Sequence, residues 1–173
     1  MAQIKYIGSN ADHLYNDGDQ VETDILNYVK EHKKNEYWDI LSKDSRWPGF
    51  YHLSDMRENI LNWYDFKPEA DILEIGAGMG AVTGLLCEKA KSVISVELTH
   101  RRAEVIYNRY TEYDNLTILV GNFNEMEFMQ KFDYITLIGV LEYAPGFTTD
   151  GEPATFIRKI KSLLKPGGKL LIA

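Results

Sequence analysis

The fold is decided by the stretch Asp71-Ile72-Leu73-Glu74-Ile75-Gly76-Ala77-Gly78-Met79-Gly80-Ala81-Val82-Thr83. Its apolar start predicts a buried strand, spaced glycines follow at once, and a helical pattern begins directly afterwards. Glycine permits backbone angles that other residues avoid, and it lets a ligand lie against main-chain N–H groups where a helix starts. The stretch therefore predicts a nucleotide-type pocket at the end of a strand.

Downstream of this stretch, strand-like and helix-like segments alternate. We expect strands at 71–75, 92–97, 116–120 and 134–138 and from Lys169, and helices at about 80–89, 100–112 and 153–164 and, shorter, near 125–130. Right-handed crossovers between such strands build a parallel sheet that helices cover on both faces. With the glycine loop at the switch point, the predicted strand order is 3-2-1-4-5, counted from 71–75.

Upstream, the pattern is different. Apolar residues recur at helical spacing over 21–29 and again over 56–64, and the turn-rich aromatic segment 47–52 between them is predicted to be a loop. We interpret residues 1–67 as a helical and aromatic cap region and residues 68–173 as the pocket-bearing domain. The aromatic loop is expected to cover the pocket as part of a lid.

Composition excludes several classes of protein. The 173 residues carry a net charge of −7, which on average repels nucleic acid and anionic membranes. The sequence has no apolar run of the ~20 residues that a membrane span needs. Its one cysteine cannot form an internal disulfide, and no His/Cys cluster has zinc-like spacing. We therefore expect a cytoplasmic protein of about one domain, with no metal site, nucleic-acid partner or membrane partner.

Two carboxylates narrow the choice of ligand. Glu97 closes the next strand, 97 − 76 = 21 residues beyond the first glycine, where an acidic residue can accept hydrogen bonds from a ribose diol. Residues 76–81 also satisfy the dinucleotide fingerprint, so the loop alone is ambiguous. Glu74 would repel a pyrophosphate, and it suits a ligand with a cationic ammonium and sulfonium and no phosphate.

At this point residues 71–173 resemble the class I S-adenosylmethionine-dependent methyltransferases, through five blocks that occur in the same order. These blocks are the glycine motif at 74–80, the acidic Glu97, the adenine-flanking segment 121–123, the fourth strand with its loop at 132–143, and the turn into the fifth strand at 163–172. The resemblance implies a Rossmann-like α/β three-layer sandwich with N-terminal helices, and S-adenosylmethionine as cofactor.

The same resemblance implies a set of cofactor-binding residues. They are Glu74, Gly76, Ala77, Gly78, Gly80, Glu97, Leu98, Asn122, Phe123 and Gly139. The amino-acid end of the cofactor is expected near Glu74 and Gly76, its ribose on Glu97, and its adenine beside Asn122 and Phe123. Asn122 departs from the family pattern, in which an acidic residue is commoner, although its side-chain carbonyl can still accept from the adenine amino group.

Candidate catalytic residues are Glu142 and Tyr143, which follow the fourth strand, and His52, which could act as a base. Arg57 is a candidate for the cofactor carboxylate. Each of these four has a structural alternative: contacts to the following helix for Glu142 and Tyr143, surface or core packing for His52, and a helix-surface salt bridge for Arg57.

We expect methyl transfer to an unidentified small-molecule or glycan acceptor. The glycan expectation follows from a faint resemblance to bacterial methyltransferases of surface-polysaccharide pathways. Residues 139–142 lack the Asn/Asp-Pro-Pro-aromatic tetrapeptide of methyltransferases that act on exocyclic or amide nitrogen. A nicotinamide-dependent oxidoreductase and a cofactor-binding domain without turnover of its own remain the alternatives.

The chain stops within the expected fifth strand, whereas the family continues with a sixth and a seventh. We therefore expect a truncated domain that binds the cofactor and turns over poorly. The sheet edge left by the missing C-terminal strands is expected to allow self-association.

Overall fold

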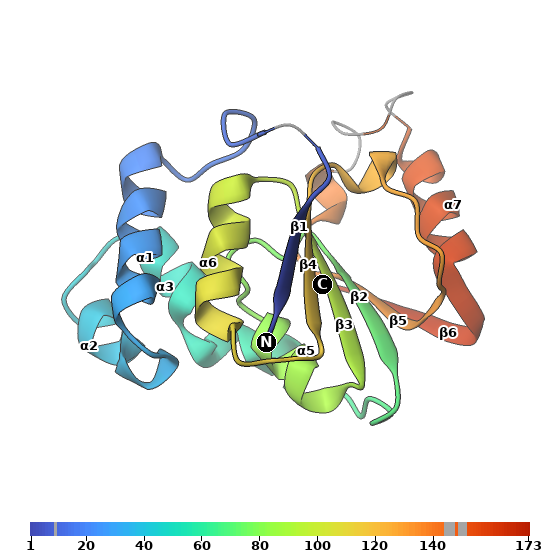
Figure 1. Cartoon of the computed structure of the whole chain (residues 1–173), viewed down its shortest axis with the longest axis horizontal. Helices are drawn as coiled ribbons and strands as arrows, with labels where there is room; N and C mark the ends of the chain where they lie inside the picture. Colours follow the sequence, from blue (N-terminus) through green and yellow to red (C-terminus); the bar gives the residue numbers. More distant parts are fainter. Residues whose placement is uncertain (9, 144–147, 149–151) are drawn as a thin grey trace.

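The computed structural model describes residues 1–8, 10–143, 148 and 152–173 (Figure 1). Its centre is a parallel six-stranded sheet in the order β1-β4-β3-β2-β5-β6. The strands are β1 Gln3–Tyr6, β2 Asp71–Ile75, β3 Ser92–Glu97, β4 Leu116–Val120, β5 Phe132–Leu137 and β6 Leu164–Ile172. The predicted order 3-2-1-4-5 corresponds to β4-β3-β2-β5-β6 and is confirmed.

Strand β1 was not predicted. It pairs in parallel with β4, with Ile4 opposite Ile118, and forms one edge of the sheet, while β6 forms the other. Of its four residues only Ile4 is partly buried, so the sequence carries no alternating pattern long enough to reveal it. The division of the chain at residue 67 stays a prediction, as does self-association through the β6 edge.

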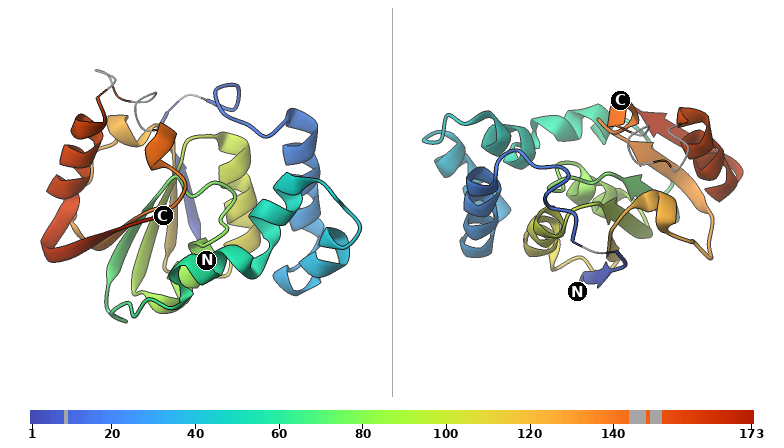
Figure 2. Two further views of the ribbon diagram at one scale, coloured as in Figure 1. Left: turned by 180° about the vertical axis from the view of Figure 1, so that it is seen from behind. Right: turned by 90° about the horizontal axis from the view of Figure 1, so that it is seen from above.

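Helices cover both faces of the sheet (Figure 2). The helices α5 Thr83–Lys89 and α6 His100–Tyr110 lie on one face, and α7 Pro153–Leu163 lies on the other. Side chains along β2 point to opposite faces of the sheet, and an apolar core lies on each face. Ile72 packs into the core under α5 and α6, and Leu73 and Ile75 pack into the core under α7. The three-layer arrangement predicted from the sequence is confirmed.

The described part of the N-terminal region adds the α-helices α1 Asp19–Glu31, α2 Tyr37–Leu41, α3 Trp47–Leu53 and α4 Asn59–Asn62, with short 3-10 helices at Lys34–Glu36 and Asp55–Glu58. Helix α1 lies alongside α6 (Figure 1). A third apolar cluster joins α1, α2 and α3 to Val105 of α6 and to Met79 of the glycine loop. The N-terminal region thus packs directly against the loop that begins the predicted pocket.

Three local expectations were wrong. Residues 47–52 form helix α3 and not a loop, because Pro48 stands at the start of the helix, where its missing N–H is not needed. The helix near 125–130 is replaced by a 3-10 turn at Phe123–Glu125, whose carbonyl groups point to Lys159. Strand β6 begins at Leu164, before the expected Lys169: Leu164 pairs with Phe132, and after a register shift the pairing with β5 resumes at Lys169, opposite Tyr134.

Within the described residues, no helix is both long enough and apolar enough to cross a membrane. The same part of the chain holds no group of three or more His, Cys, Asp or Glu residues that could bind a metal ion. Cys87 has a free thiol and is buried on α5, and this burial raises the pKa of the thiol. A cytoplasmic location stays a prediction.

Candidate functional site

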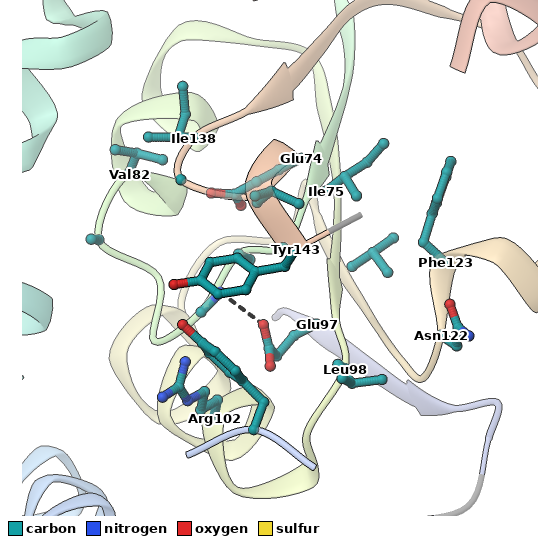
Figure 3. A pocket seen from close by; sticks show the side chains of 18 of the residues that line it. Glu74, Ile75, Val82, Glu97, Leu98, Arg102, Asn122, Phe123, Ile138 and Tyr143 are labelled. Carbon is teal, nitrogen blue, oxygen red and sulfur yellow. Dashed lines mark hydrogen bonds between the residues drawn. The ribbon is translucent and has the colours of Figure 1, made fainter. Parts of the chain in front are cut away.

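A pocket lies at the carboxyl ends of four neighbouring strands (Figure 3). Gly76, Leu98, Asn122 and Gly139 lie in the turns that follow β2, β3, β4 and β5, and all four line it. Parallel strands end at the same edge of a sheet, so segments distant in sequence meet there. The predicted cofactor residues that line this pocket are Glu74, Gly76, Ala77, Gly78, Glu97, Leu98, Asn122, Phe123 and Gly139.

Two glycines of the loop have different tasks. Gly76 has φ 71° and faces the pocket, and a Cβ there would meet Val140 Cγ2 at 2.4 Å. Gly80 does not line the pocket. A Cβ at Gly80 would meet the Tyr110 ring at 2.9 Å, so this glycine allows the loop to pack closely on α6. The prediction that Gly80 contacts the cofactor thus has no support in this geometry.

Glu74 is a fully buried carboxylate at the base of the pocket. Its Oε2 accepts hydrogen bonds from Thr83 Oγ1 at 2.7 Å and from Ser95 Oγ at 2.6 Å. Its Oε1 is buried and has no hydrogen-bond partner in the described structure. Burial raises the pKa of Glu74 to about 7. An unpaired buried carboxylate oxygen is costly, so this atom marks a place for a ligand that donates hydrogen bonds or carries positive charge.

Glu97 joins the end of β3 to the glycine loop. Its Oε2 accepts from the Gly78 N–H at 2.8 Å, the dashed line in Figure 3, and its Oε1 accepts from the N–H and Oγ1 of Thr99. The side chain is 4% exposed, and burial raises its pKa. Each carboxylate oxygen has two lone pairs, so Oε2 can accept one further hydrogen bond from a ligand.

Asn122 and Phe123 form a wall of the pocket at the end of β4. Asn122 Oδ1 accepts from the Asn124 N–H at 3.0 Å, and Phe123 is 5% exposed. The Phe123 ring packs edge-to-face against Phe156 of α7 at 5.5 Å, and Phe156 also lines the pocket. This contribution from α7 was not predicted from the sequence.

Two of the three predicted catalytic residues reach the pocket. Tyr143 and His52 line it, whereas Glu142 is exposed and is not among its lining residues. His52 is 5% exposed, and its Nε2 lies 2.8 Å from Asp17 Oδ2. Burial, with the charges of Arg102 and Arg109, lowers the pKa of His52. The imidazole is therefore neutral at pH 7, and the Nε2–H donates to the ionised Asp17.

Arg102 holds this corner of the pocket together. Its Nη2 donates to Asp17 Oδ2 at 2.8 Å, its Nε donates to Glu22 Oε1 at 2.8 Å, and its guanidinium lies 4.5 Å from the centre of the Tyr15 ring. Tyr15 lines the pocket and its ring packs edge-to-face against the Tyr143 ring, with 5.2 Å between their centres, and burial raises the pKa of Tyr15 to about 12. Hence the charges at this end of the pocket are paired with one another.

Arg57 and Tyr51 lie beside Gly139. The Arg57 guanidinium is 4.1 Å from the centre of the Tyr51 ring, and both residues line the pocket. A Cβ at Gly139 would lie 3.7 Å from Arg57 Nη2. Arg57 is partly buried and forms no salt bridge with any residue that the structure describes. Among the described residues, Arg57 thus lacks the helix-surface salt bridge that was considered for it.

Sequence reasoning missed Tyr15, Asp17 and Arg102, whereas Tyr51 belongs to the segment 47–52 that was expected to cover the pocket. No local motif marks them, because Asp17 lies 35 positions from His52 and 85 from Arg102. The one available signal was that an aromatic and charged N-terminal region precedes a glycine loop that it could cover.

Residues 73–172 match the model of a family described as methyltransferase domain. The chain is 32% identical over 82 residues to ribosomal RNA small subunit methyltransferase A of Syntrophus aciditrophicus, covering 47% of this chain and 27% of that protein. It is 30% identical to malonyl-[acyl-carrier protein] O-methyltransferase of Priestia megaterium, covering 66% of this chain and 40% of that protein. The chain thus spans less than half the length of these curated relatives.

Among solved structures, the glycopeptide N-methyltransferase MtfA complexed with S-adenosyl-L-methionine is similar, with a TM-score of 0.56. The match covers 69% of this chain and 49% of that chain at 18% identity, so it is a likeness of fold.

Proposed function

Because the chain belongs to the methyltransferase domain family, we propose that it binds S-adenosylmethionine, the cofactor of that family, in this pocket and transfers the methyl group to an acceptor. The observation that carries the proposal is the buried, unpaired Oε1 of Glu74. The cofactor has an ammonium group that can fill this position, and its lack of phosphate avoids repulsion by Glu74. A nicotinamide dinucleotide would bring a pyrophosphate close to this carboxylate.

Each part of the cofactor has a proposed partner among the lining residues. The amino-acid end lies by Glu74, Gly76, Ala77 and Gly139, the ribose bonds to the free lone pair of Glu97 Oε2, and the adenine lies against Leu98, Asn122 and Phe123. A Cβ at Gly78 would meet no atom within 4 Å, so the backbone of this glycine leaves room for the ligand.

Arg57 is proposed to bind the cofactor carboxylate. It is a partly buried cation without a salt-bridge partner among the described residues, and it lies next to Gly139 in the same pocket. A guanidinium binds a carboxylate through charge-assisted hydrogen bonds, which are stronger than neutral ones. The cofactor supplies one carboxylate, at the end that Glu74 and Gly76 are proposed to hold.

His52 is proposed to accept the proton of the acceptor. S-adenosylmethionine supplies an activated methyl group; as the bond from methyl to acceptor forms, the bond to sulfur breaks and the acceptor loses its proton. With Nε2–H donating to Asp17, His52 presents the lone pair of Nδ1. Tyr15 and Tyr143 contribute hydroxyl groups and ring faces to the same end of the pocket.

We propose an uncharged acceptor, a small molecule or a glycan. The tyrosines offer apolar faces and hydroxyl groups, whereas Arg102 is already paired with Asp17 and Glu22. Relatives act on different acceptors: their names include a ribosomal RNA methyltransferase and an acyl-carrier-protein O-methyltransferase. The first is at odds with the prediction that nucleic acid is no partner, which here rests on the net charge of −7.

Calorimetry with S-adenosylmethionine, S-adenosylhomocysteine, 5′-methylthioadenosine and NADH tests the cofactor. We expect binding of the first two and none of NADH. Arg57→Met should weaken S-adenosylhomocysteine by about tenfold and leave 5′-methylthioadenosine unchanged, since that compound lacks the carboxylate. The matched control is Arg158→Met, at an exposed site on α7.

Tight NADH binding without a response to S-adenosylmethionine would refute the proposal. Binding without methyl transfer to any acceptor would favour a domain with no turnover of its own.

A further inference from the structure

Lys159 of α7 is joined to the turn that carries Asn122 and Phe123. Its ammonium donates three hydrogen bonds to main-chain carbonyl oxygens, of Phe123 at 2.8 Å, Asn124 at 2.9 Å and Met126 at 2.6 Å. An ammonium has three donors, so the turn uses all of them. Lys159 is not among the residues that line the pocket. Lys159 therefore contacts the wall of the pocket from behind, and it acts on a ligand only through that wall.

The position of the ammonium is fixed from several sides. Its Nζ lies 4.8 Å from the centre of the Phe123 ring, and Phe156, one turn earlier on α7, packs against that ring at 5.5 Å. Desolvation lowers the pKa of Lys159, while the nearby Glu127 acts in the opposite direction. Three carbonyl dipoles converging on one partly buried cation form a link that a neutral side chain cannot reproduce.

The same turn fixes which way the Asn122 amide faces. Asn122 Oδ1 accepts from the Asn124 N–H at 3.0 Å, and Asn122 Nδ2 donates to Glu125 Oε1 at 3.3 Å. Exchanging the oxygen and nitrogen positions would oppose donor to donor and acceptor to acceptor at these two contacts. Asn122 therefore presents its oxygen in a constant orientation as long as the turn keeps its shape.

We propose that Lys159 is a positioning residue that holds the turn 122–126 and so makes the pocket selective for a base with an exocyclic amino group. This rests on the proposed function, in which the adenine of the cofactor lies beside Asn122 and Phe123. Adenine donates from its 6-amino group to an acceptor such as Asn122 Oδ1. Hypoxanthine has a carbonyl oxygen at that position, which the fixed amide oxygen repels.

The test compares S-adenosylhomocysteine with S-inosylhomocysteine by calorimetry, on the whole chain. The wild type should prefer the adenine compound by about tenfold or more. Lys159→Met should weaken S-adenosylhomocysteine and reduce this preference to about threefold or less, because the amide can then reorient. Lys159→Arg, which keeps the charge and the donors, should retain the preference. Lys161→Met, at an exposed position on the same helix, is the matched control and should behave as the wild type.

A purely structural role would lower both affinities by one factor and leave their ratio unchanged, and that result in Lys159→Met would overturn the proposal. A wild type without preference would also overturn it, independently of how any variant folds. If Lys159→Met does not fold, Lys159→Gln replaces it, and a full preference in Lys159→Gln counts against the proposal. Failure of the wild type to bind S-adenosylhomocysteine at all would instead refute the proposed function.

Discussion

The two ends of the pocket are built in different ways: the proposed cofactor end around Glu74, Gly76 and Glu97, and the proposed acceptor end around Tyr15, His52 and Arg102. At the cofactor end, the side chains belong to the last residues of adjacent strands and to the turns that follow them, and hydrogen bonds join residues such as Gly78 and Glu97, 19 positions apart. At the acceptor end, Asp17 joins His52 and Arg102 across 35 and 85 positions. The first end follows from the order of the strands, whereas the second depends on how the N-terminal region packs on α6.

Their electrostatics differ as well. The cofactor end holds two buried carboxylates with raised pKa values and leaves one oxygen of Glu74 unpaired. At the acceptor end the pKa of Asp17 is lowered by its hydrogen bond to His52 and by the charge of Arg102. The cofactor end is thus prepared for a cationic ligand, while the acceptor end has already satisfied its own charges. Substitutions at the two ends should therefore have separable effects.

The largest effect is expected from Gly76→Ala, at the cofactor end. A positive φ of 71° and a Cβ 2.4 Å from Val140 Cγ2 together should cost about 3–5 kcal/mol of unfolding free energy and abolish S-adenosylhomocysteine binding. Denaturant unfolding and calorimetry measure the two losses. Adding Val140→Ala to Gly76→Ala should recover the part of the stability loss that comes from the steric overlap, and not the part that comes from the positive φ. Equal stability of the single variant and the wild type would show that the loop is not constrained as described.

The next effect is a pH dependence from Glu74. Its pKa is about 7 in the folded protein and 4.5 unfolded, so its contribution to stability is complete below pH 4.5 and is lost as the pH rises through 7. The loss amounts to about 3 kcal/mol. The lowered pKa of His52 makes the free energy of unfolding rise with pH, which opposes the effect of Glu74. The contribution of Glu74 is therefore measured as the difference in unfolding free energy between the wild type and Glu74→Gln from pH 5 to 8.

Glu74→Gln should lack this loss of unfolding free energy. In the wild type, the affinity for S-adenosylhomocysteine should instead increase as the pH rises through 7 and Glu74 ionises. The reason is that the ammonium of the ligand stabilises the charged carboxylate. Parallel stability curves for the wild type and Glu74→Gln would contradict the assignment of a raised pKa to Glu74.

Glu97→Gln should have a smaller effect on the ligand and also a cost in stability, because the amide NH2 would face either the Gly78 N–H or the Thr99 donors. Replacing a charge-assisted hydrogen bond to the ribose by a neutral one should weaken S-adenosylhomocysteine by about ten- to a hundredfold. Glu104→Gln, on the exposed side of α6, is the control. Unchanged affinity by calorimetry would remove Glu97 from the cofactor site.

The smallest effect is expected from Asp17→Asn, at the acceptor end. Asp17 is about one-third exposed, so losing its ionic contacts with His52 and Arg102 should cost only about 1 kcal/mol of unfolding free energy. Hydrogen exchange should increase near residues 12–18, while the affinity for S-adenosylhomocysteine should stay as in the wild type. A large loss of cofactor affinity would show that the two ends are not independent.

The strand order and the cofactor end could be predicted from the sequence because each depends on short patterns. The run 71–83 specifies a buried strand, a turn that needs glycine and a helix, and Glu97 ends the next strand. At this end, prediction from the sequence differs from the structure where packing decides what a residue contacts. Gly80, for example, faces Tyr110 and not the pocket. Glu142 was predicted to reach the pocket but is exposed, since the direction of its side chain depends on the path of the backbone after β5.

The sequence by itself thus determined the parallel α/β sheet, its strand order and the residues that follow each strand at the pocket. Only the tertiary structure decided that β1 joins the sheet and that residues 47–53 form a helix. It also decided that Tyr15 and Arg102 line the pocket, and that Asp17 and Lys159 hydrogen-bond to residues that line it. The reason is the distance along the sequence. A strand, a glycine turn or a helix is encoded within a few residues, whereas the pairing of β1 with β4 and the contact of Asp17 with Arg102, 85 positions apart, exist only after the chain has folded.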